Sequence, residues 1–252
     1  MSELILSKVN CFVNENIITF HENKLKRLKV MNLKELLIHK NPYLFKAKNI
    51  NKASDLVEVL LDAQTSSSEE KMFGDFLENL AIFIASETCG GRKSAATGID
   101  MEFEDDGKFY LVSIKSGPNW GNAAQQRRQE SDFQTAVKVL KQSGHKLQIE
   151  PVLGICYGKT KTSWLRGYMK VVGQSFWYLL SKNENLYTDI VEPLGYRARE
   201  HNDTFIKEKA KIVNTFTGEF LADFTKSDGT IDWIKFVQFN SGNLDLNNEE
   251  KT

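Results

Sequence analysis

The spacing of apolar residues changes near Gly98, and this change separates a helical part of the chain from a part that carries strands. Apolar residues recur at helical spacing over Asn23–His39 and most regularly over Glu69–Ser86. Lys46–Asp62 predicts a shorter helix, and the polar run Ser66–Ser68 predicts a loop that caps the helix after it. We therefore expect an N-terminal helical segment over residues 1–65 that serves packing or dimerisation.

After Gly98 the apolar residues recur with a period of two, which is typical of a strand with one buried face. Over 99–104 three apolar residues alternate with three carboxylates: Ile99, Met101 and Phe103 against Asp100, Glu102 and Glu104. Asp105–Gly107 predicts a turn and Phe109–Lys115 a second strand, which together make a hairpin. In that hairpin we expect Lys115 to stand beside Asp100.

The remaining pattern predicts helices on both sides of a buried strand. We expect helices over Ala123–Gln142, Ser175–Leu180 and Asp203–Phe224, and a buried strand over Val152–Tyr157. The polar stretch Asn240–Thr252 predicts a disordered tail. The fold expected from this order is an α/β fold with a central mixed β-sheet flanked by helices, a catalytic domain over residues 66–240 and a polar tail over 241–252.

Charge is uneven along the chain although the formal net charge is zero. From Gly107 to Lys170 eleven Lys or Arg residues face three acids, whereas 99–106 holds five acids. An acidic cluster beside a basic stretch fits a nucleic-acid site, and it also fits an ordinary solvated surface. No run approaches the ~18 apolar residues of a membrane span, so we expect a cytoplasmic protein.

Several other chemistries are disfavoured by spacing. The three cysteines are far apart and form no CxxC pair, and the four histidines are scattered, so a zinc site is not expected. The segment Gly154–Thr160 imitates a phosphate-binding loop, but three residues separate its glycines where the motif needs four.

The hairpin carries the residue types that phosphodiester hydrolysis needs. Magnesium prefers carboxylate and carbonyl oxygens, which Asp100 and the Ile114 carbonyl can supply. Lys115 can orient the attacking water or stabilise the developing charge. The alternative for these two side chains is an exposed salt bridge within a structural hairpin.

This set resembles the PD-(D/E)XK nuclease superfamily, whose signature is an Asp on one strand and an acid-X-Lys triplet on the next. Here the matching residues are Gly98-Ile99-Asp100 and Ser113-Ile114-Lys115. The strings Ser113–Asn122, Asn41–Asn49 and Gly173–Trp177 also resemble type II restriction endonucleases of the group that cuts GGNCC-like palindromes. The resemblance covers Asn41 to Gly195 and implies a Mg²⁺-dependent endonuclease.

Ser113 departs from the pattern, because it stands where the superfamily usually has Glu or Asp. The resemblance therefore implies that the missing carboxylate comes from elsewhere. We consider three replacements: Glu78 on the preceding helix, Glu130 on the following helix and Glu102 on the strand of Asp100. Glu78 and Glu130 rank equally, and Glu102 follows because neighbouring strand carboxylates often face solvent.

The resemblance also implies that the loop and helix after Lys115 face DNA. Their amides and guanidiniums are the groups that bind phosphates and base edges. The expected DNA-binding residues are Arg92, Lys93, Ser94, Asn119, Trp120, Asn122, Gln125, Gln126, Arg127, Arg128, Lys159 and Lys161. Trp120 either stacks on a base or packs under its own loop, and we favour packing.

The partners follow from this activity. Cutting both strands of a palindrome in double-stranded DNA calls for two active sites related by a two-fold axis, hence a homodimer. A separate DNA methyltransferase would protect the host DNA without forming a stable complex. Two rivals are a structure-selective DNA repair or junction nuclease of the same superfamily and a DNA-binding module without catalysis, which Ser113 makes conceivable.

Overall fold

The computed structural model describes residues 3–244 of the chain. Its helices are α1 (Glu3–Lys29), α2 (Leu33–Ile38), α3 (Pro42–Ala47), α4 (Ala53–Cys89), α5 (Ala123–Gln142), α6 (Gln174–Ser181), α7 (Leu186–Asp189), α8 (Val191–Leu194), α9 (Ala198–Phe224) and α10 (Trp233–Ser241). They belong to two compact units, one made of residues 3–20 and 71–198 and the other of residues 21–70 and 199–244. The domain boundary that we expected between residues 65 and 66 lies inside α4.

The first unit is built on a six-stranded mixed sheet with the order β1-β2-β3-β4-β6-β5. Its strands are β1 (Arg92–Lys93), β2 (Met101–Asp105), β3 (Lys108–Lys115), β4 (Gln148–Ile155), β5 (Ser163–Leu165) and β6 (Tyr168–Val172). Strand β3 pairs in parallel with β4 and β4 in parallel with β6, whereas the other pairs are antiparallel. The prediction of a central mixed sheet flanked by helices, with a helical N-terminal segment, is confirmed.

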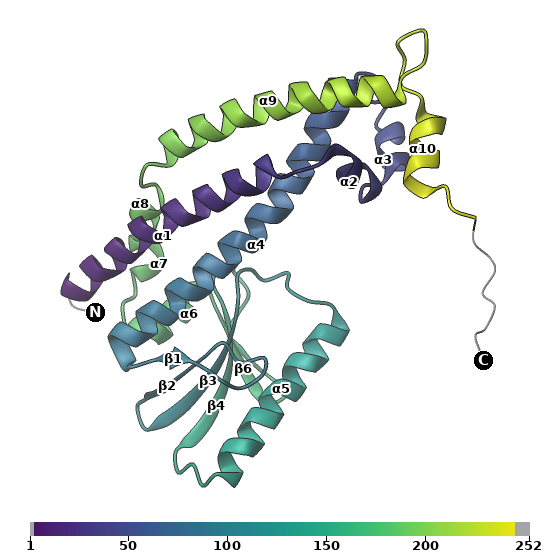
Figure 1. Cartoon of the computed structure of the whole chain (residues 1–252). Coiled ribbons are helices and arrows are strands. Elements are labelled where there is room, and N and C mark those ends of the chain that lie inside the picture. The colour runs from purple at the N-terminus through teal and green to yellow at the C-terminus, as the bar shows by residue number, and fades with distance from the viewer. Residues whose placement is uncertain (1–2, 245–252) are drawn as a thin grey trace, which may run out of the picture. The chain divides into compact units, whose positions relative to one another are not determined.

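Both faces of this sheet are covered by helices, so the two sides of each central strand are buried. Tyr110, Val112 and Ile114 of β3 pack in one apolar cluster with residues of α1, α4 and α6. Phe109 and Leu111 pack on the opposite side, where α5 contributes Phe133 and Ala136. Figure 1 shows α5 on one side of the sheet and α6 with the end of α4 on the other.

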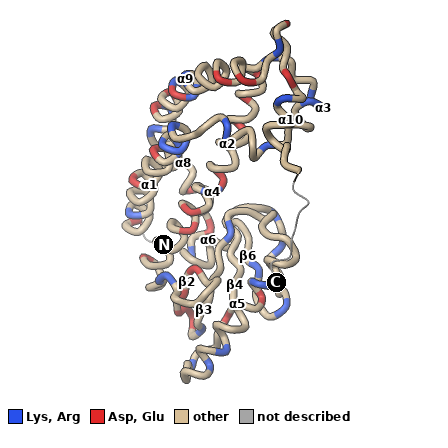
Figure 2. The backbone as a smooth tube through the Cα atoms, turned by 45° about the vertical axis from the view of Figure 1, so that its right-hand side comes forward, with Lys and Arg blue, Asp and Glu red and all other residues tan. Residues whose placement is uncertain are grey.

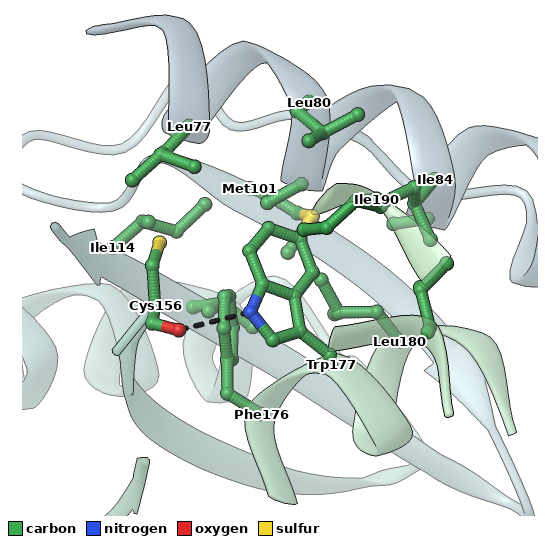
Figure 3. Packing of buried hydrophobic residues seen from close by; sticks show 14 of the residues in the cluster. Leu77, Leu80, Ile84, Met101, Ile114, Cys156, Phe176, Trp177, Leu180 and Ile190 are labelled. Atoms are coloured by element: carbon green, nitrogen blue, oxygen red, sulfur yellow. Dashed lines mark hydrogen bonds between the residues drawn. The ribbon is translucent and has the colours of Figure 1, made fainter. Parts of the chain in front are cut away.

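The cluster under α4 and α6 combines aliphatic and aromatic side chains. Leu77, Leu80 and Ile84 of α4 meet Phe176 and Trp177 of α6 over the sheet (Figure 3). The Trp177 indole N–H donates to the Cys156 carbonyl at 2.9 Å, so the polar end of this side chain has a partner although it is buried. This packing holds α4 against the edge of the sheet that carries Asp100.

The hairpin of β2 and β3 follows the predicted alternation, with one exception. Met101 pairs with Val112 across the hairpin, and Asp106 and Gly107 both have positive φ, as a two-residue turn of this hand requires. Met101 and Phe103 share one buried face as predicted, and this face packs with residues of α4. The prediction that Ile99 shares their face is wrong: it packs with the α5 side, because it precedes the strand and lies outside its alternation.

The second unit is helical and has its own apolar core. Leu56, Val57 and Leu60 of α4 pack there with Phe220 and Phe224 of α9. Helix α10 adds Phe236, and its Asn240 side chain donates to the Leu37 carbonyl at 2.6 Å. The disordered tail that we predicted from Asn240 onward overlaps α10, because Asn240 is helical. Residues 245–252 of this tail lie outside the described residues.

The predicted loop at Ser66–Ser68 is wrong, because α4 continues through it. Ser68 is buried, and its hydroxyl donates to the Gln64 carbonyl at 2.9 Å, one turn earlier. A serine that satisfies its hydroxyl on the preceding turn does not interrupt a helix. Tertiary packing thus outweighs the local preference of serine for helix ends.

Two predicted helices have different limits from those expected. The helix expected over Asn23–His39 is split, because the Asn32 side chain accepts from the Lys34 and Glu35 N–H groups and so starts α2. The helix expected over Lys46–Asp62 begins only at Ala53.

The other helices and strands divide into predicted and unpredicted ones. The expected helices near Ala123–Gln142, Ser175–Leu180 and Asp203–Phe224 are confirmed as α5, α6 and α9, and the strand expected at Val152–Tyr157 is confirmed in part as β4. Strands β1, β5 and β6 and helices α3, α7, α8 and α10 were not predicted. Over residues 3–244, no helix combines the length and the apolar character needed to cross a membrane.

Candidate active site

Asp100 and Lys115 meet where β2 and β3 begin to separate. Asp100 directly precedes β2, and its N–H donates to the Val112 carbonyl at 2.9 Å, which places it across from Ser113. Lys115 ends β3, and its Nζ lies 3.9 Å from Asp100 Oδ2. The two side chains are about 25% and 30% exposed, so the pair is open to solvent on one side. The predicted convergence of these two residues is confirmed.

The Asp100 carboxylate is held by the backbone of β3. Its Oδ2 accepts the Ile114 N–H at 2.6 Å. The N–H and C=O groups of one strand residue point to the same side of the strand, so the Ile114 carbonyl is also directed toward the edge that carries Asp100. A carboxylate and a carbonyl oxygen therefore share this edge.

Ser113 connects this pair to helix α5. Its side chain is fully buried, and its Oγ accepts from Lys115 Nζ at 3.1 Å. The same Oγ lies 2.9 Å from Gln129 Oε1 and 3.3 Å from Asp100 Oδ2. Ser113 is thus the point at which the metal-binding candidate, the lysine and the helix meet.

Sequence reasoning missed Gln129, which is buried on α5. A signal for it exists in the pattern of that helix. Gln129, Phe133 and Ala136 are the buried residues of α5, and they follow one another at i, i+4 and i+7. A glutamine at a core-facing position must find hydrogen-bond partners, and it finds them at Ser113 and Gly98.

Glu78 of α4 is the candidate acid on which the Asp100 charge acts. Burial raises the pKa of Glu78, and the Asp100 carboxylate raises this pKa further, while Lys93 and Lys115 lower it. Within residues 3–244 no three His, Cys, Asp or Glu side chains gather as a metal cluster.

The other two candidate acids have different partners. Glu102 accepts from Arg92 Nε at 2.9 Å and from the Ser94 hydroxyl at 3.0 Å. Glu130 Oε2 lies 3.7 Å from Nη1 of Arg166, a residue of the turn between β5 and β6. The charges of Asp100 and Lys115 therefore act on Glu78, whereas Glu102 and Glu130 are paired with arginines.

Five of the residues expected to contact DNA are engaged within the chain. Arg92 and Ser94 bind Glu102. Asn122 accepts from the Ala124 and Gln125 N–H groups, and the Gln125 side chain accepts the Asn122 N–H, so these two residues form a capping box at the start of α5. Trp120 packs against the α5 side of the sheet and lies under the Lys115 ammonium, 5.7 Å from ring centroid to Nζ.

The remaining expected contacts are exposed, although the Gln126 amide also donates to the Gly121 carbonyl at 3.5 Å. The exposed residues of this set are Lys93, Asn119, Gln126, Arg127, Arg128, Lys159 and Lys161. Arg127 and Arg128 form no ion pair within the described part of the chain. Figure 2 shows Lys and Arg on α5 and on the loops next to β6. Exposed cations in this arrangement suit a polyanion.

Comparison with known proteins agrees with this geometry. The family model described as type II restriction endonuclease EcoO109I matches residues 7–202, which include the sheet, the hairpin and α5. No curated protein matches the chain. This match covers well over half of the chain and therefore shows the family to which the chain belongs. The chain therefore belongs to the type II restriction endonuclease EcoO109I family of DNA-hydrolysing enzymes.

Proposed function

We propose that this protein is a Mg²⁺-dependent, site-specific endonuclease with a PD-(D/E)XK-type centre that cuts double-stranded DNA at a short palindrome. The observation that carries the proposal is the placement of Lys115 Nζ 3.9 Å from Asp100 Oδ2 at an open edge of the sheet. An ordinary exposed salt bridge would not need a buried serine and a buried glutamine beneath it. The family assignment supports the same reaction class.

The residues present fit a magnesium ion. Burial raises the pKa of Glu78, and the charge of the Asp100 carboxylate raises it further, so the two carboxylates repel each other. A divalent cation between two such carboxylates removes that repulsion, and hard oxygen ligands are those that Mg²⁺ prefers. Asp100, Glu78 and the Ile114 carbonyl would hold the ion. When bound, Mg²⁺ polarises the phosphoryl oxygens and lowers the pKa of the attacking water.

Lys115 supplies the cation that the protein itself brings to the reaction. Its ammonium accepts no hydrogen bonds and can donate three, of which one goes to Ser113 Oγ. The others are directed to the attacking water and to a nonbridging phosphate oxygen. Lys115 thus orients the water and neutralises the charge that builds up on the phosphorus oxygens.

Glu78 replaces the acid that is missing at Ser113. Its support is proximity, since the Asp100 and Lys115 charges both act on Glu78. Glu102 is neutralised by Arg92, and Glu130 lies beside Arg166. We therefore assign the second carboxylate of the site to Glu78, with Ser113 as a hydrogen-bonding residue rather than a metal ligand.

The exposed residues around the site hold the duplex. Lys93, Arg127, Arg128, Lys159 and Lys161 contact phosphates, and Asn119 and Gln126 reach toward phosphates or base edges. Arg92, Ser94, Asn122, Trp120 and Gln125 support this surface through the intramolecular contacts described above. A palindrome presents two equivalent scissile phosphates, so the active form is a homodimer, and a methyltransferase of the same system protects the host DNA.

A plasmid digest with and without Mg²⁺ tests the function. Discrete fragments of double-stranded plasmid that require Mg²⁺ would support a restriction enzyme, and sequencing the fragment ends would give its site. Cuts confined to junctions or damaged DNA would instead identify a structure-selective repair nuclease. Intact DNA together with a gel shift would identify a DNA-binding module without catalysis.

A further inference from the structure

Gln129 is tied at both ends of its amide to the segments that carry the site. Its Nε2 donates to the Gly98 carbonyl at 3.0 Å, two residues before Asp100. Its Oε1 lies 2.9 Å from Ser113 Oγ. The side chain is only 6% exposed, so both ends of the amide need hydrogen-bond partners within the protein.

The orientation of this amide follows from the chemistry of its partners. A backbone carbonyl only accepts hydrogen bonds, so the amide must present its NH₂ group to Gly98 and its oxygen to Ser113. The Ser113 hydroxyl has one proton and two neighbouring acceptors. That proton goes to Gln129 at 2.9 Å, because 3.3 Å to Asp100 exceeds an ordinary O–H···O bond.

The direction of the Ser113 hydroxyl proton determines whether the Ser113 oxygen can accept a hydrogen bond from Lys115. With its proton directed at Gln129, the Ser113 oxygen has its lone pairs free for the Lys115 ammonium, which donates to it at 3.1 Å. The chain of bonds runs from Gly98 through Gln129 and Ser113 to Lys115. Each hydrogen bond in this chain has a defined donor and a defined acceptor. If the direction of one bond were reversed, the next bond would lose its donor or its acceptor.

Gly98 allows α5 to come close enough for this contact. It has φ of +74°, and a Cβ at this position would lie 2.3 Å from Asp132 Oδ2 of α5. Any side chain here would push the helix away from the segment before Asp100. The close approach of α5 and the bond from Gln129 to Gly98 therefore depend on the same glycine.

We propose that Gln129 is a positioning residue that sets Lys115 through Ser113, and that position 113 needs a side chain which donates to Gln129 and accepts from Lys115. This inference rests on the proposed nuclease function. A carboxylate at position 113 would have no proton for Gln129 Oε1 and would face that oxygen directly. Ser113 is then a fitted part of this centre and not merely the remnant of a lost acid.

A matched pair of variants at position 113 tests the requirement. Ser113→Asn and Ser113→Asp introduce the same shape, but only the amide can donate to Gln129 and accept from Lys115 at once. We expect the Asn variant to cleave plasmid DNA at least about 10-fold faster than the Asp variant, under single-turnover conditions with Mg²⁺. An Asp variant as fast as the Asn variant, or faster, would overturn the inference, because it would mean that the position needs an acid.

A second test asks whether Gln129 acts through Ser113. Gln129→Met keeps the length of the side chain and removes both hydrogen bonds. We expect cleavage about 10- to 100-fold slower, with DNA affinity in Ca²⁺ unchanged. The double variant Ser113→Ala, Gln129→Met should be no slower than the slower single variant. If the rate losses of the two single variants multiply in the double variant, Gln129 does not act through Ser113. A Gln129→Met enzyme that cleaves at the wild-type rate would also contradict the inference.

The control is Gln134→Met, the same substitution at an exposed position of α5, which should cleave at the wild-type rate. Thermal melting shows whether each variant is folded, and if Gln129→Met is not, the position-113 pair decides. The experiments distinguish a failure of the proposed nuclease function from a failure of the proposed role of Gln129. A wild-type protein that never cuts DNA overturns both, whereas a cutting enzyme with an unaffected Gln129→Met variant overturns only this one.

Discussion

The Ile114 N–H donates to Asp100 Oδ2 at 2.6 Å, so the carboxylate of one strand is anchored to the backbone of the next. The donor is a main-chain group and is therefore present with any residue except proline at position 114. This bond places Asp100 beside the strand that ends in Lys115 before any ion or DNA is bound.

This anchoring predicts that charge at Asp100 can be removed without losing the fold. Asn at position 100 can still accept the Ile114 N–H, so we expect Asp100→Asn to melt close to the wild type. Its cleavage rate should fall by about 10²-fold or more, because the carboxylate charge is gone. Lys115→Ala should behave in the same way, since Lys115 is about 30% exposed. Plasmid cleavage and a gel shift in Ca²⁺ measure the two properties separately. Wild-type cutting by either variant would remove the basis of the proposed mechanism.

The source of the second carboxylate is tested by two glutamate substitutions. Glu78→Gln should slow cleavage by about 10²-fold, because Glu78 is the acid next to Asp100. Glu130→Gln should leave the rate within a few-fold of wild type, since Glu130 pairs with Arg166 instead. Both variants are compared under single-turnover conditions at several Mg²⁺ concentrations. If Glu130→Gln slowed cleavage more than Glu78→Gln, the second carboxylate would instead be Glu130 of α5.

The raised pKa of Glu78 predicts a pH-dependent stability. Between the ordinary pKa of 4.5 and the raised value, the folded protein binds more protons at Glu78 than the unfolded chain does. Without Mg²⁺, the contribution of Glu78 to the free energy of unfolding should therefore fall as pH rises through this window. Glu78→Gln should remove that loss and melt at a higher temperature than wild type at pH 7. Addition of Mg²⁺ should raise the melting temperature of the wild type and not that of Glu78→Gln. Identical melting curves for the two proteins across this pH range would contradict the assignment.

His21 predicts the opposite pH dependence in the second unit. Burial, the neighbouring His201 and Lys24 lower the pKa of His21 from 6.5 to about 4. From pH 6.5 down to about 4 the unfolded chain takes up this proton before the folded protein does, so stability is complete above pH 6.5 and falls with acidification. His21→Phe keeps a ring that can stack on His201, which lies 4.7 Å away between centroids. This variant should lose less stability than wild type between pH 6.5 and 4 in urea titrations. An equal loss would show that His21 does not carry the effect.

Two glycine substitutions should change stability in opposite directions. A Cβ at Gly154 of β4 would lie 2.2 Å from the Phe176 ring, so Gly154→Ala should destabilise the protein by about 1–3 kcal/mol through overpacking. Gly218 is exposed within α9, and a Cβ there meets nothing within 4 Å. Gly218→Ala should stabilise that helix by about 0.5–1 kcal/mol. Denaturant titration measures both, and a neutral Gly154→Ala would mean that Phe176 can move aside.

Local rules in the sequence account for the hairpin and for most helices. The period-two alternation at Met101 and Phe103 and the Asp106-Gly107 turn depend on adjacent residues, so they could be read without coordinates. The meeting of Asp100 and Lys115 follows from that hairpin, because the pairing register is set by the turn. The same reasoning failed at Ser66–Ser68, where burial within α4 outweighs the local preference of serine.

The sequence by itself determined the residue types of the centre and the hairpin that joins them. Only the tertiary structure decided that Gln129 of α5, rather than Glu130, contacts Ser113, and that the Asp100 charge acts on Glu78 of α4. It also decided that Arg92 and Ser94 bind Glu102. The physical reason is that the position of a helix against a sheet is set by packing between segments far apart in the chain. A rotation of α5 by one residue would exchange Gln129 for Glu130, and no local pattern of charge distinguishes the two.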